Sequence, residues 1–200
     1  ITDRAQETTE LTSETVADDI DGRLAERMRS VQFAATTVGF HDPIMTHQRD
    51  TLRAFVRHTG FNGASIIDNN GTMRAITILG TPPAESQSLI GQDFSDRQYV
   101  QRALAGNIFI SEPVEANSGN LIVTISAPIR DNGTIVGAFN GALHLRNTSL
   151  FRPSETPRDS SQRLTVTSGN DTLFSGGSPL SEDAAGYLTA TSTVNQTGWT

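Results

Sequence analysis

Apolar residues recur at spacings of three to five through the first forty positions of the chain, with polar residues between them. This spacing places apolar side chains on one face of a helix, and it predicts one long amphipathic helix from Ile1 to Phe40. Pro43 ends the helix, because a proline lacks the amide hydrogen and disfavours helix in the residue before it. The apolar positions are Leu11, Val16, Ile20, Leu24, Met28, Val31, Ala35 and Val38.

A second, shorter helix is predicted from Gln48 to His58, where Leu52, Phe55 and Val56 share one face. Gly60 follows it, and glycine commonly ends a helix because it adopts left-handed backbone angles without strain. The first sixty residues are therefore assigned to two helices. Helices near forty residues are much longer than the 10 to 14 residues usual in globular domains. A helix of that length usually spans subdomains or lines a dimer.

Short β-prone runs separated by turn residues follow the helices. ASIID and TMRAITIL flank Asn69-Asn70-Gly71, which predicts a hairpin. Residues 81–88 are expected to form a loop, and residues 93–104 a helix capped by Ser95. Asp131-Asn132-Gly133 predicts the turn between the last two of three further strands. Together the runs predict an α+β fold with an antiparallel sheet of five strands, the last three being Ile108–Val114, Leu121–Arg130 and Thr134–Leu145.

A polar, proline-bearing connector follows Leu145, and a second set of short strands follows the connector. RLTVTS, TLFSGG and GYLTATSTV are the β-prone runs, with turn chemistry at Gly169-Asn170-Asp171. They predict a second, smaller α/β unit that is incomplete at Thr200, so we expect the chain to be part of a longer protein. The expected organisation is helices in 1–60, a larger unit in 61–150 and a smaller one in 151–200.

The composition of the chain excludes several classes of binding partner and of chemistry. The net charge is −7, and all fifteen basic residues are Arg, with no stretch dense enough to neutralise a nucleic acid backbone. An acidic chain without Lys resembles proteins of extreme halophiles, and a GC-rich genome is the alternative explanation. The absence of Cys excludes disulfides and thiol catalysis. No run of about eighteen apolar residues is present, so the chain itself is not expected to cross a membrane.

Three motifs occur in a fixed order: IIDNNGTM, LIGQDFSDRQYVQRALAG and ISEPVEANSGNLIVTISAPIRDNGTIVGAFNGAL. Their order and spacing resemble the double Cache family (dCache or PDC), the PAS-like sensor domains found outside the membrane in histidine kinases and chemoreceptors. The resemblance implies a long helix followed by two tandem PAS-like units, membrane-distal in 61–150 and membrane-proximal in 151–200. It further implies flanking transmembrane helices in the full-length protein and a homodimer through the N-terminal helix.

The resemblance also places a ligand pocket in the larger unit and carries Asp96, Arg97 and Tyr99 into it. The chemistry of these residues supports that role independently. An Arg can bind a carboxylate through two parallel hydrogen bonds, and a Tyr supplies an apolar wall with a polar tip. The alternative interpretation is that Arg97 is an ordinary solvated residue on a helix.

Period-two alternation places Asn140, Ala142 and His144 on one face of the last strand of the larger unit. Together with Thr124 and Ser126 of the neighbouring strand, this face is expected to line the pocket, while Phe139 and Leu143 pack against the long helix. Many amino-acid-binding members of the family carry an Asp at the position of Ala142, where it holds the ligand ammonium. A buried ammonium without a counter-charge is costly, so we expect a carboxylate, another small anion or a neutral metabolite.

Other kinds of site have little support in the sequence. His41, Asp42, His47, Asp50 and His58 lack the spacing of a metal motif, and no cofactor is expected. No nucleophile, base and orienting group come together, so we expect this segment not to be an enzyme. The favoured function is the sensor domain of a membrane histidine kinase. The alternatives are the sensor domain of a chemotaxis transducer, a solute-binding protein and a structural domain of the cell surface.

Overall fold

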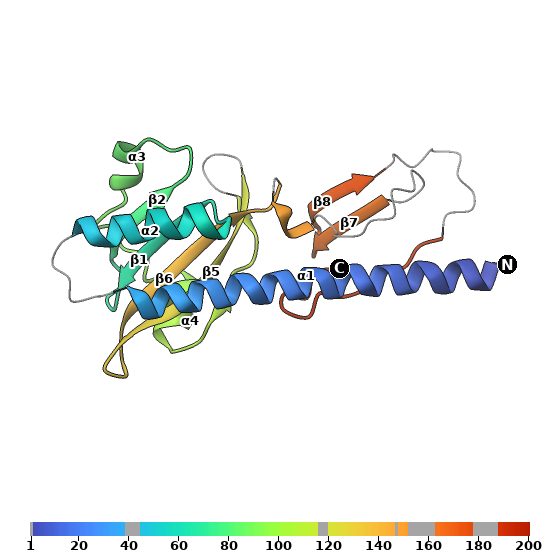
Figure 1. Ribbon diagram of the computed structural model, residues 1–200, viewed down its shortest axis with the longest axis horizontal. Coiled ribbons are helices and arrows are strands. Elements are labelled where there is room, and N and C mark those ends of the chain that lie inside the picture. The colour runs from blue at the N-terminus through green and yellow to red at the C-terminus, as the bar shows by residue number, and fades with distance from the viewer. Residues whose placement is uncertain (1, 39–44, 116–119, 147, 152–162, 178–187) are drawn as a thin grey trace. The chain divides into compact units, whose positions relative to one another are not determined.

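The computed structural model describes residues 2–38, 45–115, 120–146, 148–151, 163–177 and 188–200. These residues combine helices with antiparallel sheet (Figure 1), which confirms the predicted α+β fold. The chain divides into two compact units. Unit 1 comprises Ile1–Ala25 and Leu145–Thr200, and unit 2 comprises Glu26–His144. The long helix α1, Thr2–Thr37, contributes residues to both units.

Unit 2 contains a six-stranded antiparallel sheet in the order β2-β1-β6-β5-β3, with β4 also paired to β5. The two longest strands, β5 and β6, form a hairpin whose turn residues Asn132 and Gly133 have φ angles of 47° and 84°. Positive φ at both positions suits the turn that matches the twist of a hairpin, and Asn-Gly adopts it readily. The strands are β1 (Gly63–Asp68), β2 (Met73–Ile78), β3 (Phe109–Ile110), β4 (Val114–Glu115), β5 (Leu121–Asp131) and β6 (Thr134–His144).

One face of this sheet packs against α1 and against α2, Met45–Thr59. The ring of Phe139 meets the ring of Phe55 on α2 edge-on, with centroids 4.9 Å apart. Gly141 faces Phe61 and Val31 of α1, and a Cβ at Gly141 would lie 2.7 Å from the Phe61 ring. The sequence predicted that Phe139 packs against the long helix. The structure places its ring against Phe55 of α2, and Val31 of α1 lies close to Gly141 on the same face.

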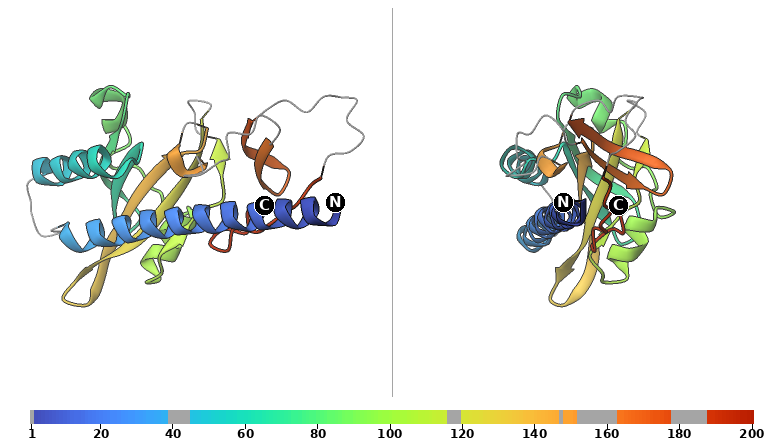
Figure 2. Two further views of the ribbon diagram at one scale, coloured as in Figure 1. Left: turned by 45° about the vertical axis from the view of Figure 1, so that its right-hand side comes forward. Right: turned by 90° about the vertical axis from the view of Figure 1, so that its right-hand side faces the viewer.

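The opposite face of the sheet carries α4, Gln98–Leu104. Val100 of α4 is fully buried with Ile67 of β1 and Met73 of β2. In the right-hand view of Figure 2, α2 and the unit 2 part of α1 lie on one side of the sheet and α4 lies on the other. The partly buried residues around this cluster are Ile76, Phe94, Tyr99 and Leu104, so Phe94, Val100 and Leu104 contribute to the core as predicted.

Unit 1 is built around a small aromatic cluster. The ring of Phe151 lies 5.6 Å from that of Phe174 and 5.9 Å from that of Trp199, measured between centroids. Trp199 is 1% exposed. Aromatic pairs at such distances stabilise beyond the area they bury. The elements that carry the cluster are the 3-10 turn η1 (Ser149–Phe151) and the hairpin of β7 (Arg163–Ser168) and β8 (Asp171–Gly177).

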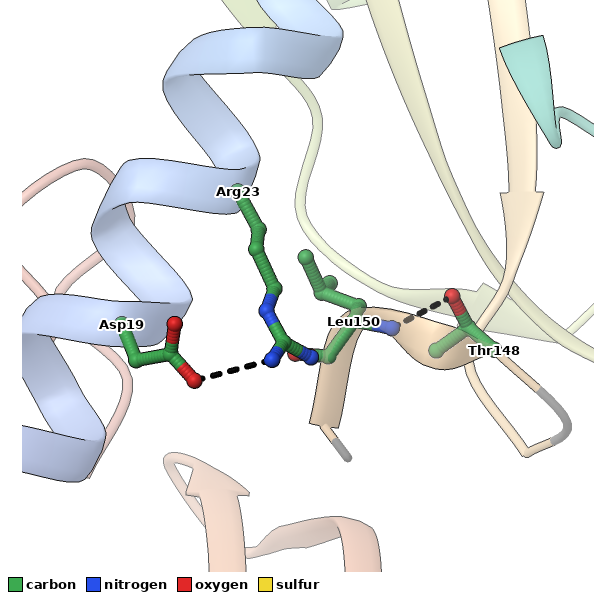
Figure 3. A network of polar contacts seen from close by, with 4 residues as sticks. All are labelled: Asp19, Arg23, Thr148 and Leu150. Atoms are coloured by element: carbon green, nitrogen blue, oxygen red, sulfur yellow. Dashed lines mark hydrogen bonds and ion pairs between the residues drawn. The ribbon is translucent and has the colours of Figure 1, made fainter. Parts of the chain in front are cut away.

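Asp21 and Arg23 of α1 hold neighbouring segments of unit 1. The Asp21 carboxylate accepts hydrogen bonds from the backbone amides of Asn195 and Gln196, at 2.7 and 2.8 Å, and from the Asn195 side chain. Asp19 pairs with Arg23 at 2.9 Å (Figure 3). Arg23 also donates to the Leu150 carbonyl. Charge-assisted hydrogen bonds of this kind are stronger than neutral ones. They fasten the helix to η1 and to the segment before Trp199.

The structure corrects several expected boundaries. Residues 83–87 form the helix α3 where a loop was expected, because a proline in the first helical turn gives up an amide that has no partner there. The expected strand 108–114 is divided into β3 and β4, so the sheet has six strands and not five. Pro113 lies between the two parts and has no amide hydrogen to donate to a ladder. In the described part of GYLTATSTV, residues 188–193 form no strand.

The helix predicted from residue 93 begins later, at Gln98. Ser95 does not cap it. The Asp93 carboxylate accepts the Ser95 amide at 2.8 Å, which makes a local turn, and Arg97 occupies the N-cap position with extended backbone angles. Asp and Asn side chains commonly bond the amide two residues on in this way. The turn delays the helix and places Asp96 and Arg97 before its first turn.

Candidate functional site

A row of three polar side chains crosses the centre of the unit 2 sheet on the face that carries α4. The register pairs Ser65 of β1 with Asn140 of β6, and Asn140 with Ser126 of β5. Ser126 Oγ donates to Asn140 Oδ1 at 2.5 Å, and Asn140 Nδ2 donates to Ser65 Oγ at 3.2 Å. Asn140 is 2% exposed and Ser126 is 0% exposed. The row is therefore a polar network, buried at Asn140 and Ser126 and half-buried at Ser65, on a sheet face whose neighbouring cluster is apolar.

This network leaves hydrogen-bond capacity unused. An Asn side chain offers two N–H donors, and Asn140 directs one of them to Ser65. The Ser65 hydroxyl accepts in that bond, so its own hydrogen is available as a donor. Buried polar groups are costly unless they are satisfied, and an apolar row would fill this face without that cost. The arrangement suits an oxygen acceptor on a small molecule, such as a carbonyl or carboxylate.

The next row of the sheet lies beside the first on the same face. It pairs Gly63, Ala142 and Thr124 across β1, β6 and β5. Thr124 is buried, Ala142 is half-buried, and the Thr124 amide donates to Ser111 Oγ at 2.9 Å. None of the residues in these two rows carries a charge. The predicted shared face of Thr124, Ser126, Asn140 and Ala142 is thus confirmed as geometry, and a ligand ammonium would meet no carboxylate from it.

Tyr99 lies on this side of the sheet, packed against the Ile67, Met73 and Val100 cluster. Burial raises the pKa of the Tyr99 phenol, the nearby Arg97 lowers it in part, and Asp96 adds to the rise. Tyr99 is therefore a neutral hydrogen-bond donor at physiological pH, because its ordinary pKa is already near 10.

The structure does not bury the two charged residues of the predicted site. The Arg97 side chain is 59% exposed, and its Nε lies 3.5 Å from an oxygen of its neighbour Asp96. An exposed ion pair of this kind contributes little to stability. The structure therefore unites the sheet residues and Tyr99 on one face, while Arg97 and Asp96 stay in solvent at the start of α4.

Ser65 belongs to the row, but the sequence prediction missed it. Its signal was present in ASIID, where period-two alternation places Ser65 between Gly63 and Ile67 on one face. The pairing of β1 with β6 was needed to bring that face beside Asn140. A second missed feature is Phe109, paired with Ser126 in the register, whose ring lies under the Arg102 guanidinium at 5.6 Å. A cation over an aromatic ring is a favourable contact.

His144 shares the face of Asn140 and Ala142 by alternation and is half-buried. Burial lowers the pKa of the His144 imidazole, which keeps the ring neutral near neutral pH. Its backbone amide donates to Asn62 Oδ1 at 2.8 Å. Across the described residues, no group of three or more His, Cys, Asp or Glu side chains is placed to hold a metal ion. His41 and Asp42 lie outside the described residues.

No helix within the described ranges is both long enough and apolar enough to cross a membrane. The sequence profile of the Cache domain family matches residues 1–200 of the chain. No curated protein shows a significant sequence match to it.

Solved structures share the fold of this chain. The ligand-binding domain of the Pseudomonas fluorescens chemoreceptor CtaA, in complex with L-valine, gives a TM-score of 0.54 at 21% identity, over 72% of this chain and 63% of that one. The ligand-binding domain of the Campylobacter jejuni chemoreceptor Tlp3, also in complex with L-valine, gives a TM-score of 0.61 at 12% identity, over 72% of this chain and 61% of that one. An extracellular ligand binding receptor from Desulfohalobium retbaense gives 0.52 at 19% identity, over 64% and 24%. The chain therefore spans less than two thirds of each of these structures.

Proposed function

The chain belongs to the Cache domain family, and from this premise we propose that it is a ligand-binding sensor domain of a membrane signalling receptor. The observation that carries the proposal is the polar row of Ser65, Asn140 and Ser126, in which Asn140 and Ser126 are buried. A sheet that served only as a scaffold would gain stability from apolar residues in these positions. A sheet that binds a small polar molecule needs donors and acceptors on one face, held in place before the ligand arrives.

The proposed ligand is a small carboxylate or a neutral metabolite with an oxygen acceptor. The relatives from P. fluorescens and C. jejuni are chemoreceptor domains in complex with L-valine, which supports a ligand of small size. In this chain Ala142 and the other residues of the two rows offer no carboxylate to an ammonium group. An uncompensated buried ammonium would cost several kcal/mol. We therefore place α-amino acids bound through a buried ammonium behind carboxylates in the order of candidates.

In the full-length protein, we place the domain outside the membrane, between flanking transmembrane helices, as in receptors of this family. The proposed output is a histidine kinase, and a chemotaxis transducer is the alternative. A ligand shifts the receptor only by the difference between its affinities for the two signalling states. The helix α1 is the element proposed to carry the change and to pair with its copy in a homodimer. The acidic, Lys-free composition supports a halophilic origin.

We expect Arg97→Ala to weaken binding of a carboxylate at least tenfold while the domain stays folded. The reason is that Arg97 is exposed, so its loss removes a fork that can bind the carboxylate without opening a cavity. A thermal-shift screen of the purified domain, in high salt, with small carboxylates, amino acids and neutral metabolites measures the effect. A ligand at a hundred times its Kd adds about 2.7 kcal/mol of stability.

Arg74→Ala is the matched control, since Arg74 is also an exposed arginine of unit 2, paired at 3.8 Å with an aspartate. It should leave the ligand-induced shift unchanged. An equal ligand-induced increase in melting temperature in wild type and Arg97→Ala would show that Arg97 does not contribute to ligand binding. A panel that stabilises neither wild type nor control, with cooperative melts throughout, would favour a structural domain over a sensor.

A further inference from the structure

A cleft of about 200 Å³ opens along the outer edge of β2 in unit 2, outside the Ser65, Asn140 and Ser126 row. The strand order leaves β2 as the terminal strand of the sheet. Near its start, Met73 exchanges backbone hydrogen bonds with Gly91 and Gln92, so that part of the edge is covered. The cleft lies farther along, between the end of β2, α3 and one face of α2.

Three arginines from α2 line the cleft: Arg49, Arg53 and Arg57. They stand four residues apart, so they project from one face of the helix in a line. At a rise of 1.5 Å per residue, the first and third are separated by about 12 Å along the axis. Three guanidinium groups in a line suit an elongated anion with separated charges better than a single compact ion.

The positive charge of this line is poorly compensated. Arg53 lies 3.6 Å from Asp50, while Arg49 and Arg57 pair with no carboxylate among the described residues. No Asp or Glu lines the cleft. The described α2 sequence carries these three arginines against one aspartate, a local balance of +2 (3 − 1), in a chain whose net charge is −7. Clefts lined by one sign of charge raise the local concentration of the opposite ion.

The other walls of the cleft combine apolar surface with free hydroxyls. Leu79 and Pro83 supply apolar side chains. The hydroxyls of Thr77 and Thr81 also line it, and within the described parts of the chain neither bonds to another group. Apolar walls suit a carbon skeleton, and the hydroxyls can donate to its oxygens. A condensed phosphate would satisfy the arginines but would leave the apolar walls unused.

We propose that this cleft is a second ligand site, for a small polycarboxylate whose carboxylate groups bind along Arg49, Arg53 and Arg57. It is separate from the site over the Asn140 row and does not depend on the sensor function proposed for that site. Arg forks bind carboxylates through paired hydrogen bonds, and two or more such pairs distinguish a polycarboxylate from a monocarboxylate.

Calorimetric titration of the purified chain with citrate at low ionic strength tests the proposal. Citrate is expected to bind saturably, and acetate at equal ionic strength at least tenfold more weakly. The double variant Arg49→Gln with Arg57→Gln should lose at least tenfold in citrate affinity. Gln has a helix propensity similar to that of Arg, so α2 is retained. The matched control is Arg74→Gln with Arg130→Gln, which removes the same charge from two other exposed arginines of unit 2.

The control variant should bind citrate as wild type does. If the double variant unfolds, the single variant Arg57→Gln replaces it, and circular dichroism confirms that this variant is folded. It should also bind citrate more weakly than wild type does. Equal citrate affinity in wild type and in the folded cleft variant would overturn the proposal, as would the absence of saturable binding to wild type. Pyrophosphate binding tighter than citrate would overturn the assignment to a carbon skeleton. Loss of citrate binding in Arg97→Ala but not in the cleft variant would show that citrate binds at the Asn140 row and not in the cleft.

Discussion

Replacing Gly71 with alanine is expected to lower the free energy of unfolding of unit 2 by about 3 kcal/mol. Gly71 has a φ of +85°, and left-handed angles cost an L-residue about 1–2 kcal/mol. A Cβ at this position would also lie 2.7 Å from Ser95 Cα and 2.8 Å from Ser95 N, which are backbone atoms that cannot rotate away. Forced contacts of this kind add about 1–3 kcal/mol. Urea denaturation followed by far-UV circular dichroism measures the loss.

Gly91→Ala is the matched control for this prediction. Gly91 has the same φ of +85°, but a Cβ there would meet no atom within 4 Å. It should cost only the backbone strain, about 1–2 kcal/mol. Equal losses in the two variants would show that the contact between the β1–β2 turn and Ser95 is unimportant. A larger loss at Gly71 would establish that this turn holds the segment that leads into Arg97 and Tyr99.

Trp199→Ala is expected to destabilise unit 1 by about 3–5 kcal/mol, the usual cost of removing a buried large aromatic side chain. Trp199 is 1% exposed and its ring lies against Phe151. The neighbouring Thr200 exchanges backbone hydrogen bonds with Thr167 of β7, which hold the terminal segment against this strand. Because Trp199 is the only tryptophan, the variant loses its fluorescence signal, and circular dichroism must follow the denaturation.

Two comparisons make the Trp199 result specific. Trp199→Phe keeps a ring against Phe151, so it should lower the stability of unit 1 much less than Trp199→Ala does. Leu11→Ala removes a 57% exposed side chain from the unit 1 part of α1 and should change stability by less than about 0.5 kcal/mol. A loss below about 1 kcal/mol in Trp199→Ala would contradict the aromatic cluster as the core of unit 1.

Local chemistry predicted those parts of the fold that depend on neighbouring residues. The β5–β6 hairpin was predicted to within one residue at each end, because Asn132-Gly133 adopts positive φ at both turn positions. The errors arose where one residue favours two alternative local structures. Pro83 indicates a loop in most contexts yet begins α3 here, and the Asx turn at Asp93 postpones α4. Neither outcome follows from periodicity alone.

The candidate site was predictable in part for a similar reason. Alternation within a strand fixes which residues share a face, so Asn140 with Ala142 and Thr124 with Ser126 followed from the sequence. The pairing between strands is set by tertiary structure, and it was required to add Ser65 to the row. The exposure of Arg97 depends on where α4 begins. The arginine line on α2 was visible as a spacing of four, but the β2 edge opposite it was not.

The central claim is that a small ligand binds over the Ser65, Asn140 and Ser126 row. The most direct test is the ¹H–¹⁵N spectrum of the Asn140 side-chain amide, assigned by its loss in Asn140→Ser, during titration with the strongest stabilising carboxylate of the screen. Binding over the row should change the chemical shifts of both Asn140 side-chain amide hydrogens in proportion to saturation. The reason is that one of these hydrogens bonds to Ser65, and a ligand oxygen would accept the other. Unchanged Asn140 resonances at a saturating ligand concentration would contradict the account.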